Sequence, residues 1–329
     1  MSEPNVRIYT SGDQLPEGLM EHNFFHSPRL FLLCQQTPRL RPYMVTVQYK
    51  GRILAQLLCM VRRRSSWMPP YLYRHCLIQG IGCYNSSDDD DAMTVNELFA
   101  LMLHAITDHL KRSVLYLEVK HLSQKMFGYR VFRDEGYFPV RWMSIHNSLH
   151  SHTPEERISE RMQRRIDTAY KRGIVTDDVK SHEDFEEFIR LLKQHNRLKP
   201  KRYIPDWQFF QGILENGDGR LHLTRYHGHI IGCSAVVYSQ RQAFLWYAAY
   251  RRKSYAYVSP DVLTIWHAIK DAHSRHYEHI FFMDVGLPFR KNSFRDFILR
   301  FGGKPTSTYR WFFCTIGWIN RLLSWIYRD

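Results

Sequence analysis

The sequence predicts an α/β (α+β) protein built from two tandem domains of similar plan. Its 329 residues are enough for two domains, each with a core of its own. Residues 243–303 read as an apolar strand, a basic loop, a helix with apolar residues at helical spacing, and a second apolar strand. Short motifs of the first half recur in the same order in the second. We therefore expect domains at 1–150 and 151–329.

The repeat consists of short matches between the two halves. They are Tyr49-x-Gly51-x-Ile53 with Tyr226-x-Gly228-x-Ile230, His104-Ala105-Ile106-x-Asp108 with His267-Ala268-Ile269-x-Asp271, Leu117-Glu118-Val119 with Met283-Asp284-Val285, and Gly136-x-x-Pro139 with Gly302-x-x-Pro305. Any single match could arise by chance, but matches in one order argue for a duplicated domain.

The first half predicts a sheet with one long helix. We expect strands at 6–10, 43–47, 53–61, 77–81 and 114–119, one or two short helices within 15–34 broken at Pro28, and a helix at 94–110. Lys50-Gly51 supplies the turn of a hairpin. Residues 84–91 include four consecutive aspartates. Because a calcium loop needs spaced ligands and a closing Glu, we expect a solvated loop there.

The second half begins after a polar stretch at 150–154. A strongly charged helix follows at 155–172 and ends at Gly173, a favourable C-cap. Ser181 and Asp184 form a capping box for a helix through Gln194. Further elements are expected as a helix at 206–214, strands at 221–226, 230–238, 243–250 and 280–282, and a helix opened by Ser259 as N-cap and Pro260 in the first turn.

Composition points to anionic partners. The net charge of +14, from 46 basic and 32 acidic residues, favours nucleic acid, phosphorylated cofactors or an anionic membrane face. The six cysteines and 18 histidines show no metal-ligand spacing, so we predict reduced thiols and no metal. Without a signal-peptide pattern or an apolar run of about 20 residues, we expect a cytoplasmic location.

The motifs of the second half resemble the GNAT acyltransferases, and more closely their two-domain Fem-type (FemAB-like) branch. The matching residues are Arg251-x-x-Ser254-x-Ala256, Ser259-Pro260, Leu263, Trp266, Ile269, Phe282-x-Asp284-x-Gly286, Phe294-Arg295, Phe297 and Phe301-Gly302-Gly303. The resemblance implies two tandem GNAT-like domains, each a mixed, mostly antiparallel sheet flanked by helices, with the active cleft in the second. Two departures stand out: Ser254 replaces the central glycine of the loop, and Arg295 replaces the lysine of Fem-type proteins.

The basic loop before Ser259 is the predicted cofactor site. Unpaired N–H groups and the helix dipole make a helix N-terminus an anion site, and three cations precede this one. The predicted cofactor-binding residues are Arg251, Arg252, Lys253, Ser254, Ala256 and Ser259. They would hold the pyrophosphate of coenzyme A or the backbone of a transfer RNA. The alternative is an exposed polar turn.

Three residues are the predicted catalytic groups. Acyl transfer to an amine needs a base, because a free amine near pKa ~10 is mostly protonated at neutral pH. Asp284 or Tyr255 could be that base, and Arg295 could stabilise an oxyanion. Alternatively Asp284 is structural, since Glu118 matches it in the first repeat, and Arg295 is a solvated cation. The predicted substrate-binding residues are Arg202, Tyr203 and Asn292.

Three functions remain open on the sequence. The resemblance implies an N-acyltransferase that moves an acyl group from acyl-CoA or acetyl-CoA to a small-molecule or lipid-linked amine. It also allows a Fem-type enzyme that uses aminoacyl-tRNA to modify a cell-wall or lipid-linked precursor. The third possibility is a non-catalytic anion-binding protein.

The C-terminal stretch 317–329 predicts an amphipathic helix, with two tryptophans on its apolar side and arginines on the other. Such a helix suits an anionic membrane interface, which would place the protein peripherally at the inner membrane face. The commoner alternative, which we favour here, is that the helix folds back and buries its tryptophans.

Overall fold

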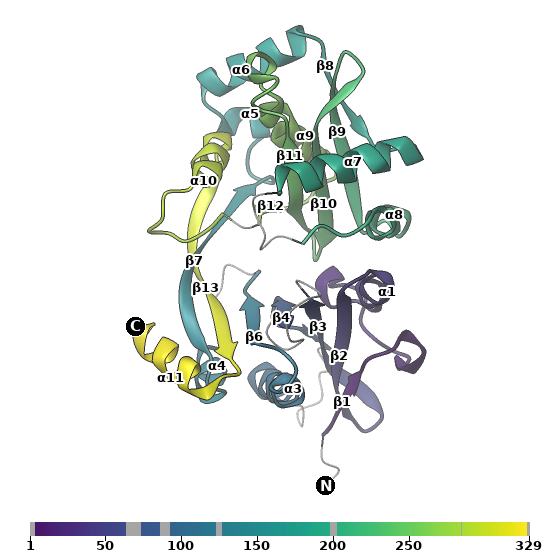
Figure 1. The fold of residues 1–329 in the computed structure, drawn as a ribbon, viewed down its shortest axis with the longest axis vertical. Helices are drawn as coiled ribbons and strands as arrows, with labels where there is room; N and C mark the ends of the chain where they lie inside the picture. Colours follow the sequence, from purple (N-terminus) through teal and green to yellow (C-terminus); the bar gives the residue numbers. More distant parts are fainter. Residues whose placement is uncertain are drawn as a thin grey trace. The chain divides into compact units, whose positions relative to one another are not determined.

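The computed structural model describes residues 4–63, 74–85, 93–122, 127–197, 203–283 and 285–327. It divides into two compact units, one of residues 1–142 and 308–329 and the other of residues 143–307 (Figure 1). Arg202, Asp284 and most of the expected loop at 84–91 lie outside the described residues.

The first unit is built on a mixed sheet. Its strands, in spatial order, are β1 (Asn5–Tyr9), β2 (Leu40–Tyr49), β3 (Arg52–Arg63), β4 (Arg74–Gln79), β6 (Tyr116–Lys120) and the later part of β13 (Lys304–Cys314), with β5 (Cys83–Tyr84) beside β3. β4 and β6 pair in parallel, and β1–β2, β2–β3, β3–β4, β3–β5 and β6–β13 pair antiparallel. Helix α3 (Val95–Leu110) packs on β1, β2 and β3, and its apolar face enters their shared core. α4 (Tyr129–Asp134) lies beside α3.

One helix of this unit corrects the sequence prediction. α1 (Pro28–Gln36) begins at Pro28, where we expected a break. The Ser27 hydroxyl accepts a hydrogen bond from the Leu30 N–H, so Ser27 is the N-cap. Proline at the first helical position forfeits an N–H that would have no helical partner anyway, so it starts the helix without cost.

The second unit has a sheet of similar plan. Its strands, in spatial order, are the later part of β7 (Phe138–Ser148), β12 (His279–Phe282), β11 (Gln242–Tyr250), β10 (His229–Ser239), β9 (Gly219–Tyr226) and β8 (Ile174–Asp178). Its helices are α5 (Pro154–Arg157), α6 (Glu160–Lys171), α7 (His182–His195), α8 (Trp207–Glu215), α9 (Pro260–Ser274) and α10 (Ser293–Ile298). The predicted helix at 155–172 is therefore two helices, because Ser159 caps α6 through the Met162 N–H.

Helices cover both faces of this second sheet. Gly232 of β10 lies under Thr264 of α9, and the next residue, Cys233, contacts the carbonyl of Phe188 in α7. Successive residues of a strand point to opposite faces. α9 and α7 therefore lie on opposite sides, and α6 packs against α9.

The duplication predicted from the sequence is visible in matching turns. Lys50 and Gly51 between β2 and β3 have φ of 48° and 78°, and His227 and Gly228 between β9 and β10 have φ of 47° and 78°. Two consecutive positive φ values define the turn that best matches the twist of a hairpin. The parallel pairs β4–β6 and β11–β12 and the helices α3 and α9 also correspond. The predicted fold class is confirmed.

The unit boundaries differ from the expected 1–150 and 151–329. β7, the last strand of the first repeat, pairs with β12 of the second unit. β13, the last strand of the second repeat, pairs with β6 of the first unit. Residues 308–329 consequently belong to the first unit. Which strand each of these two pairs with depends on tertiary packing, so the sequence alone did not reveal it.

The C-terminal helix α11 (Gly317–Ile326) overturns our expectation that its tryptophans would be buried. The Asn320 side chain accepts a hydrogen bond from the Cys314 N–H at 2.9 Å and donates one to the Gly136 carbonyl at 3.0 Å. This polar side therefore faces the unit. Trp318 and Trp325 are each 65% exposed.

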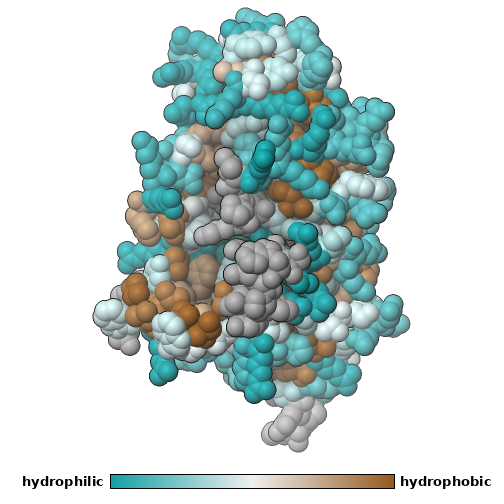
Figure 2. Space-filling view, in the orientation of Figure 1, coloured by the Kyte–Doolittle hydropathy of each residue, from teal (hydrophilic) through white to brown (hydrophobic). Residues whose placement is uncertain are grey.

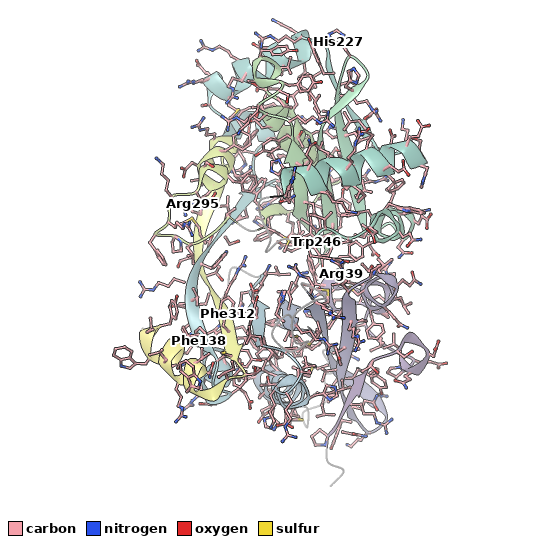
Figure 3. All side chains as sticks on the ribbon, in the orientation of Figure 1. Arg39, Phe138, His227, Trp246, Arg295 and Phe312 are labelled. Atoms are coloured by element: carbon pink, nitrogen blue, oxygen red, sulfur yellow. The ribbon has the colours of Figure 1, made fainter. Side chains whose placement is uncertain are left out.

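The outward side of α11 forms an apolar patch. Its exposed apolar residues are Trp318, Leu322, Trp325, Ile326 and, just after the helix, Tyr327. Figure 2 shows a brown area with pale side chains among it at the lower left, where Figure 1 places α11. Tyr327 stacks on Phe138, labelled in Figure 3, with ring centroids 5.8 Å apart. Among the described residues, no helix is long and apolar enough to span a membrane.

Candidate active site

In the centre of the second sheet, β11 extends beyond the end of β12, and the sheet opens where the two strands stop pairing. The parallel pairing of these strands ends at Leu245 and Phe282, whereas β11 continues to Tyr250. Trp246, labelled in Figure 3, is the extra residue of a bulge: Val236 of β10 lies opposite Leu245, and Ala235 lies opposite Tyr247. A bulge bends its strand and re-aims its backbone groups. The strand edge beyond Leu245 is thus the place where a ligand carbonyl could meet backbone N–H groups.

The loop after β11 leads directly to the start of α9. The Arg251 N–H donates to the Ile231 carbonyl at 2.8 Å, which ties the loop to β10. A Cβ at Gly232 would collide with Thr264 Oγ1, so only glycine lets the first turns of α9 lie this close to the sheet. The N-terminus of a 15-residue helix is thereby fixed beside the opening.

Ser259 occupies the predicted N-cap position without performing the predicted cap. It adopts the left-handed conformation, with φ 53° and ψ 57°, and within the described structure its side chain makes no cap hydrogen bond. Instead its hydroxyl accepts a hydrogen bond from Arg165 Nη2 at 3.3 Å. The first N–H groups of α9 are therefore not capped by Ser259.

A cavity of about 590 Å³ lies at this helix start. Its lining residues come from one face of α6 and from the end of the loop: Arg161, Arg164, Arg165, Thr168, Ala169, Arg172, Tyr257, Val258 and Ser259. Arginine binds phosphate through planar, paired donors, and the helix dipole adds to that attraction. The cavity is therefore suited to a ligand with several phosphate groups.

These four arginines were not among the predicted site residues. Their spacing places them on one side of the charged helix. The sequence did not show that this side of α6 would face the start of α9. Of the predicted cofactor-binding residues, only Ser259 lines the cavity. Lys253, Ser254 and Ala256 are exposed on the turn.

The remaining loop cations have other surroundings. Arg252 Nε lies 3.5 Å from an oxygen of Asp261, whose side chain is 3% exposed. Arg251 is half-buried at the base of the loop. The main cationic surface of the site is therefore on α6, and not on the loop where we expected it.

Arg295 and Asn292 hold the segment after β12. The Arg295 guanidinium donates to the carbonyls of Leu287 at 2.7 Å and Arg290 at 3.0 Å (Figure 3). Asn292 caps α10 by accepting from Phe294 and Arg295 N–H groups, and it donates to the Val285 carbonyl at 2.9 Å. Both side chains are engaged in shaping this loop, which favours a positioning role for each.

Tyrosines gather near the same helix start. Tyr255 and Tyr257 both pack against Tyr226, with ring centroids 6.2 Å and 6.0 Å away. Burial raises the pKa of Tyr250, the last residue of β11, to about 12, so its phenol stays protonated at neutral pH. Tyr203 is half-buried, and its carbonyl accepts a hydrogen bond from the Tyr247 hydroxyl at 3.3 Å.

Residues 157–291, which contain the opening, the loop and the cavity, match the acetyltransferase (GNAT) domain family. The second unit carries a GNAT domain. This match confirms the predicted superfamily and, at the level of the domain family, the predicted class of acyltransferase. A search of curated proteins finds no sequence match to the chain.

Solved structures agree on the fold of the whole chain. FemX aligns with a TM-score of 0.65 at 11% identity, over 98% of this chain and all of that one. A tandem GNAT protein from the clavulanic acid biosynthesis pathway aligns with a TM-score of 0.53 at 10% identity, over 88% of each chain. The C-terminal domain of a putative lysylphosphatidylglycerol synthetase from Agrobacterium fabrum gives 0.55 at 9% identity, over 83% of this chain and 84% of that one. At these identities the likeness shows the fold alone.

Proposed function

We propose that the GNAT domain transfers an acyl group from an acyl-CoA thioester to an amine. The observation that carries this proposal is the cavity at the start of α9, lined by three arginines of α6 and by Arg172 just after it. Coenzyme A carries a pyrophosphate and a 3′-phosphate, and both need such cationic donors. The opening beside β11 would receive the thioester.

The proposed reaction combines backbone groups of β11 with acid and base side chains of the second repeat. The amine nitrogen attacks the thioester carbonyl carbon, while backbone N–H groups of β11 beyond Leu245 stabilise the oxyanion. Asp284 or Tyr255 takes the proton from the amine. As the C–N bond forms and the C–S bond breaks, the thiolate leaves and takes up the proton that the base removed from the amine. The protonated Tyr250 phenol, a weaker acid than a thiol, can donate a hydrogen bond to the leaving sulfur. Arg295 holds the neighbouring loop in shape.

Binding of coenzyme A tests the donor assignment directly. We expect coenzyme A to raise the melting temperature, and dephospho-coenzyme A, which lacks the 3′-phosphate, to raise it less. Labelled acyl-CoA should then label an amine acceptor. If acyl-CoAs of every chain length neither bind nor stabilise the protein, the donor assignment is overturned. If they bind but no amine is ever acylated, the protein is an anion-binding module instead.

Aminoacyl-tRNA is the second candidate donor. Arg161, Arg164 and Arg172 are exposed as well as lining the cavity, so they present a cationic surface that a polyanion could follow. Binding of tRNA that weakens steeply with salt, without any response to coenzyme A, would favour this donor. Tight coenzyme A binding with salt-insensitive, weak tRNA binding would exclude it.

We also propose that the acceptor is presented at an anionic membrane surface, at which α11 docks. The helix turns Trp318 and Trp325 outward, and Arg321 is exposed between them in the sequence. Indole rings and arginine together suit the interface between lipid headgroups and acyl chains, and the net charge of +14 adds attraction to anionic lipid. One structural relative is named for a lipid product, lysylphosphatidylglycerol.

Vesicle sedimentation tests this surface. The full chain should sediment with vesicles that contain phosphatidylglycerol and less with neutral phosphatidylcholine vesicles. Replacing both Trp318 and Trp325 by Ser should abolish sedimentation, while Leu32→Ser, at a 43% exposed apolar residue of α1, should not. Concentration-dependent dimerisation that the double variant abolishes, without vesicle binding, would identify a second copy as the true partner and overturn the proposal.

A further inference from the structure

A second cluster of ligating side chains lies in the GNAT domain, outside the cavity described above. Asp178 at the end of β8, His222 in β9 and His267 in α9 place one ligand atom each within 4.8 Å of one another. The rings of His222 and His267 are nearly perpendicular, with centroids 4.6 Å apart. The three residues are far apart in sequence, so a search for local metal motifs could not find them.

The buried histidine of this cluster has an unusual hydrogen-bond arrangement. His222 Nδ1 lies 2.9 Å from an Asp178 oxygen. Its Nε2 is buried and has no hydrogen-bond partner within the described residues, and it lies 3.6 Å from an Asp271 oxygen. The His222 side chain is only 2% exposed, so water does not readily satisfy that nitrogen.

A neutral His222 fits these surroundings poorly. If Nδ1 carries the proton and donates to Asp178, Nε2 presents a lone pair toward the carboxylate of Asp271. Asp271 cannot turn away easily, because it accepts hydrogen bonds from Tyr238 at 2.7 Å and from Arg275 at 3.0 Å. A cation bound at Nδ1 would resolve this conflict: the ring proton would then reside on Nε2 and point to Asp271.

We propose that Asp178, His222 and His267 bind a divalent transition-metal ion of the zinc type. Two imidazoles and one carboxylate are a common zinc ligand set, with a fourth position left for water. In tetrahedral coordination the His222 and Asp178 atoms would separate only slightly from their present 2.9 Å. Asp271, Tyr238 and Arg275 would form the outer hydrogen-bonded layer that fixes the ring of His222. The ion would join β8, β9 and α9.

Zinc titration of the full chain tests the site. After treatment with a chelator and its removal, the protein should bind one Zn²⁺ per chain in competition with a chromophoric chelator, and Zn²⁺ should raise its melting temperature. Co²⁺ should give the visible absorption bands of four-coordinate cobalt. These readouts do not depend on acyl transfer, so failure of the proposed function would leave them unaffected.

Variants separate this site from adventitious binding by other histidines. Asp271→Asn should weaken zinc binding by about 10–100-fold, the usual cost of losing an outer partner. His267→Ala and Asp178→Asn should weaken it by more, whereas His229→Ala, which removes an exposed histidine of β10, should leave it unchanged. Equal affinities in all four variants, or no stoichiometric binding by the parent chain, would overturn the proposal.

Discussion

The two repeats begin their corresponding helices in different ways. In the first unit, Thr94 and Glu97 form a capping box: the Thr94 hydroxyl accepts from the Glu97 N–H at 3.3 Å, and the Glu97 carboxylate accepts from the Thr94 N–H at 2.8 Å. In the second unit, Ser259 turns its hydroxyl to Arg165. The first repeat therefore caps its helix start with a side-chain capping box. The start of the second helix, which has Asp261 in its first turn, lies beside a cationic cavity and has no side-chain cap from Ser259.

A second feature of the first unit concerns Glu118, the acidic residue that matches Asp284 in the repeat. Glu118 in β6 lies 3.0 Å from Arg310, and each side chain is 12% exposed. The Arg310 guanidinium also lies over the ring of Trp142, 3.7 Å from its centroid. In the first unit this carboxylate is thus part of the packing. Duplication kept the fold in both halves, and among the described residues the second unit has an arginine-lined cavity at the start of α9.

The largest expected effect separates Asp284 from Glu118. If Asp284 is the base, Asp284→Asn should lower kcat by about 10²–10⁴-fold, the usual contribution of a general base, with little change in melting temperature. The measurements are steady-state acyl transfer and thermal melting. A melting temperature that falls with unchanged kcat would show that Asp284 is structural, as Glu118 is.

Removing the arginine bonded to Ser259 should have the next largest effect. Arg165→Ala removes a charged donor from the cavity, and such hydrogen bonds contribute about 1.5–3 kcal/mol, so KM for the donor should rise by about 10–100-fold. Arg190→Ala is the matched control, because Arg190 is an exposed arginine of α7 that pairs with Glu187. Equal KM values for the two variants would contradict the proposed site.

The sequence predicted the fold better than the site, for physical reasons. Strand alternation, capping residues and turn glycines are local, so β2–β3, α3 and the capping box at Ser181 were correctly expected. The cavity depends on which face of α6 packs on α9, and the unit boundary depends on the partners chosen by β7 and β13. Both depend on contacts between elements far apart in the sequence, which local patterns do not specify. Ser259 fits the sequence pattern of an N-cap, yet its hydroxyl accepts a hydrogen bond from Arg165 instead of capping the helix.

Breaking the ion pair of the first unit should reduce stability without touching catalysis. Arg310→Met leaves Glu118 largely buried without its partner, which should lower the free energy of unfolding by about 1–3 kcal/mol. Denaturant unfolding measures the loss, and acyl-transfer kinetics of the folded protein should stay as in the parent. A fall in kcat at unchanged stability would show that the first unit contributes to the reaction.

The smallest expected effects come from the two helix starts themselves, and they should have opposite signs. Thr94→Ala removes a cap that satisfies an N–H group of α3, so the free energy of unfolding should fall by about 0.5–2 kcal/mol. Ser259→Gly relieves a non-glycine residue held at φ 53°, a conformation that costs about 1 kcal/mol. The bond from Arg165 that is lost is long, at 3.3 Å, so it contributes less than this and stability should rise. Denaturant unfolding of the two variants measures both signs. If Ser259→Gly destabilised the protein as Thr94→Ala does, the hydrogen bond from Arg165 would outweigh the backbone strain. Ser259 would then have a structural role, and its hydroxyl and Arg165 would bind each other rather than a ligand.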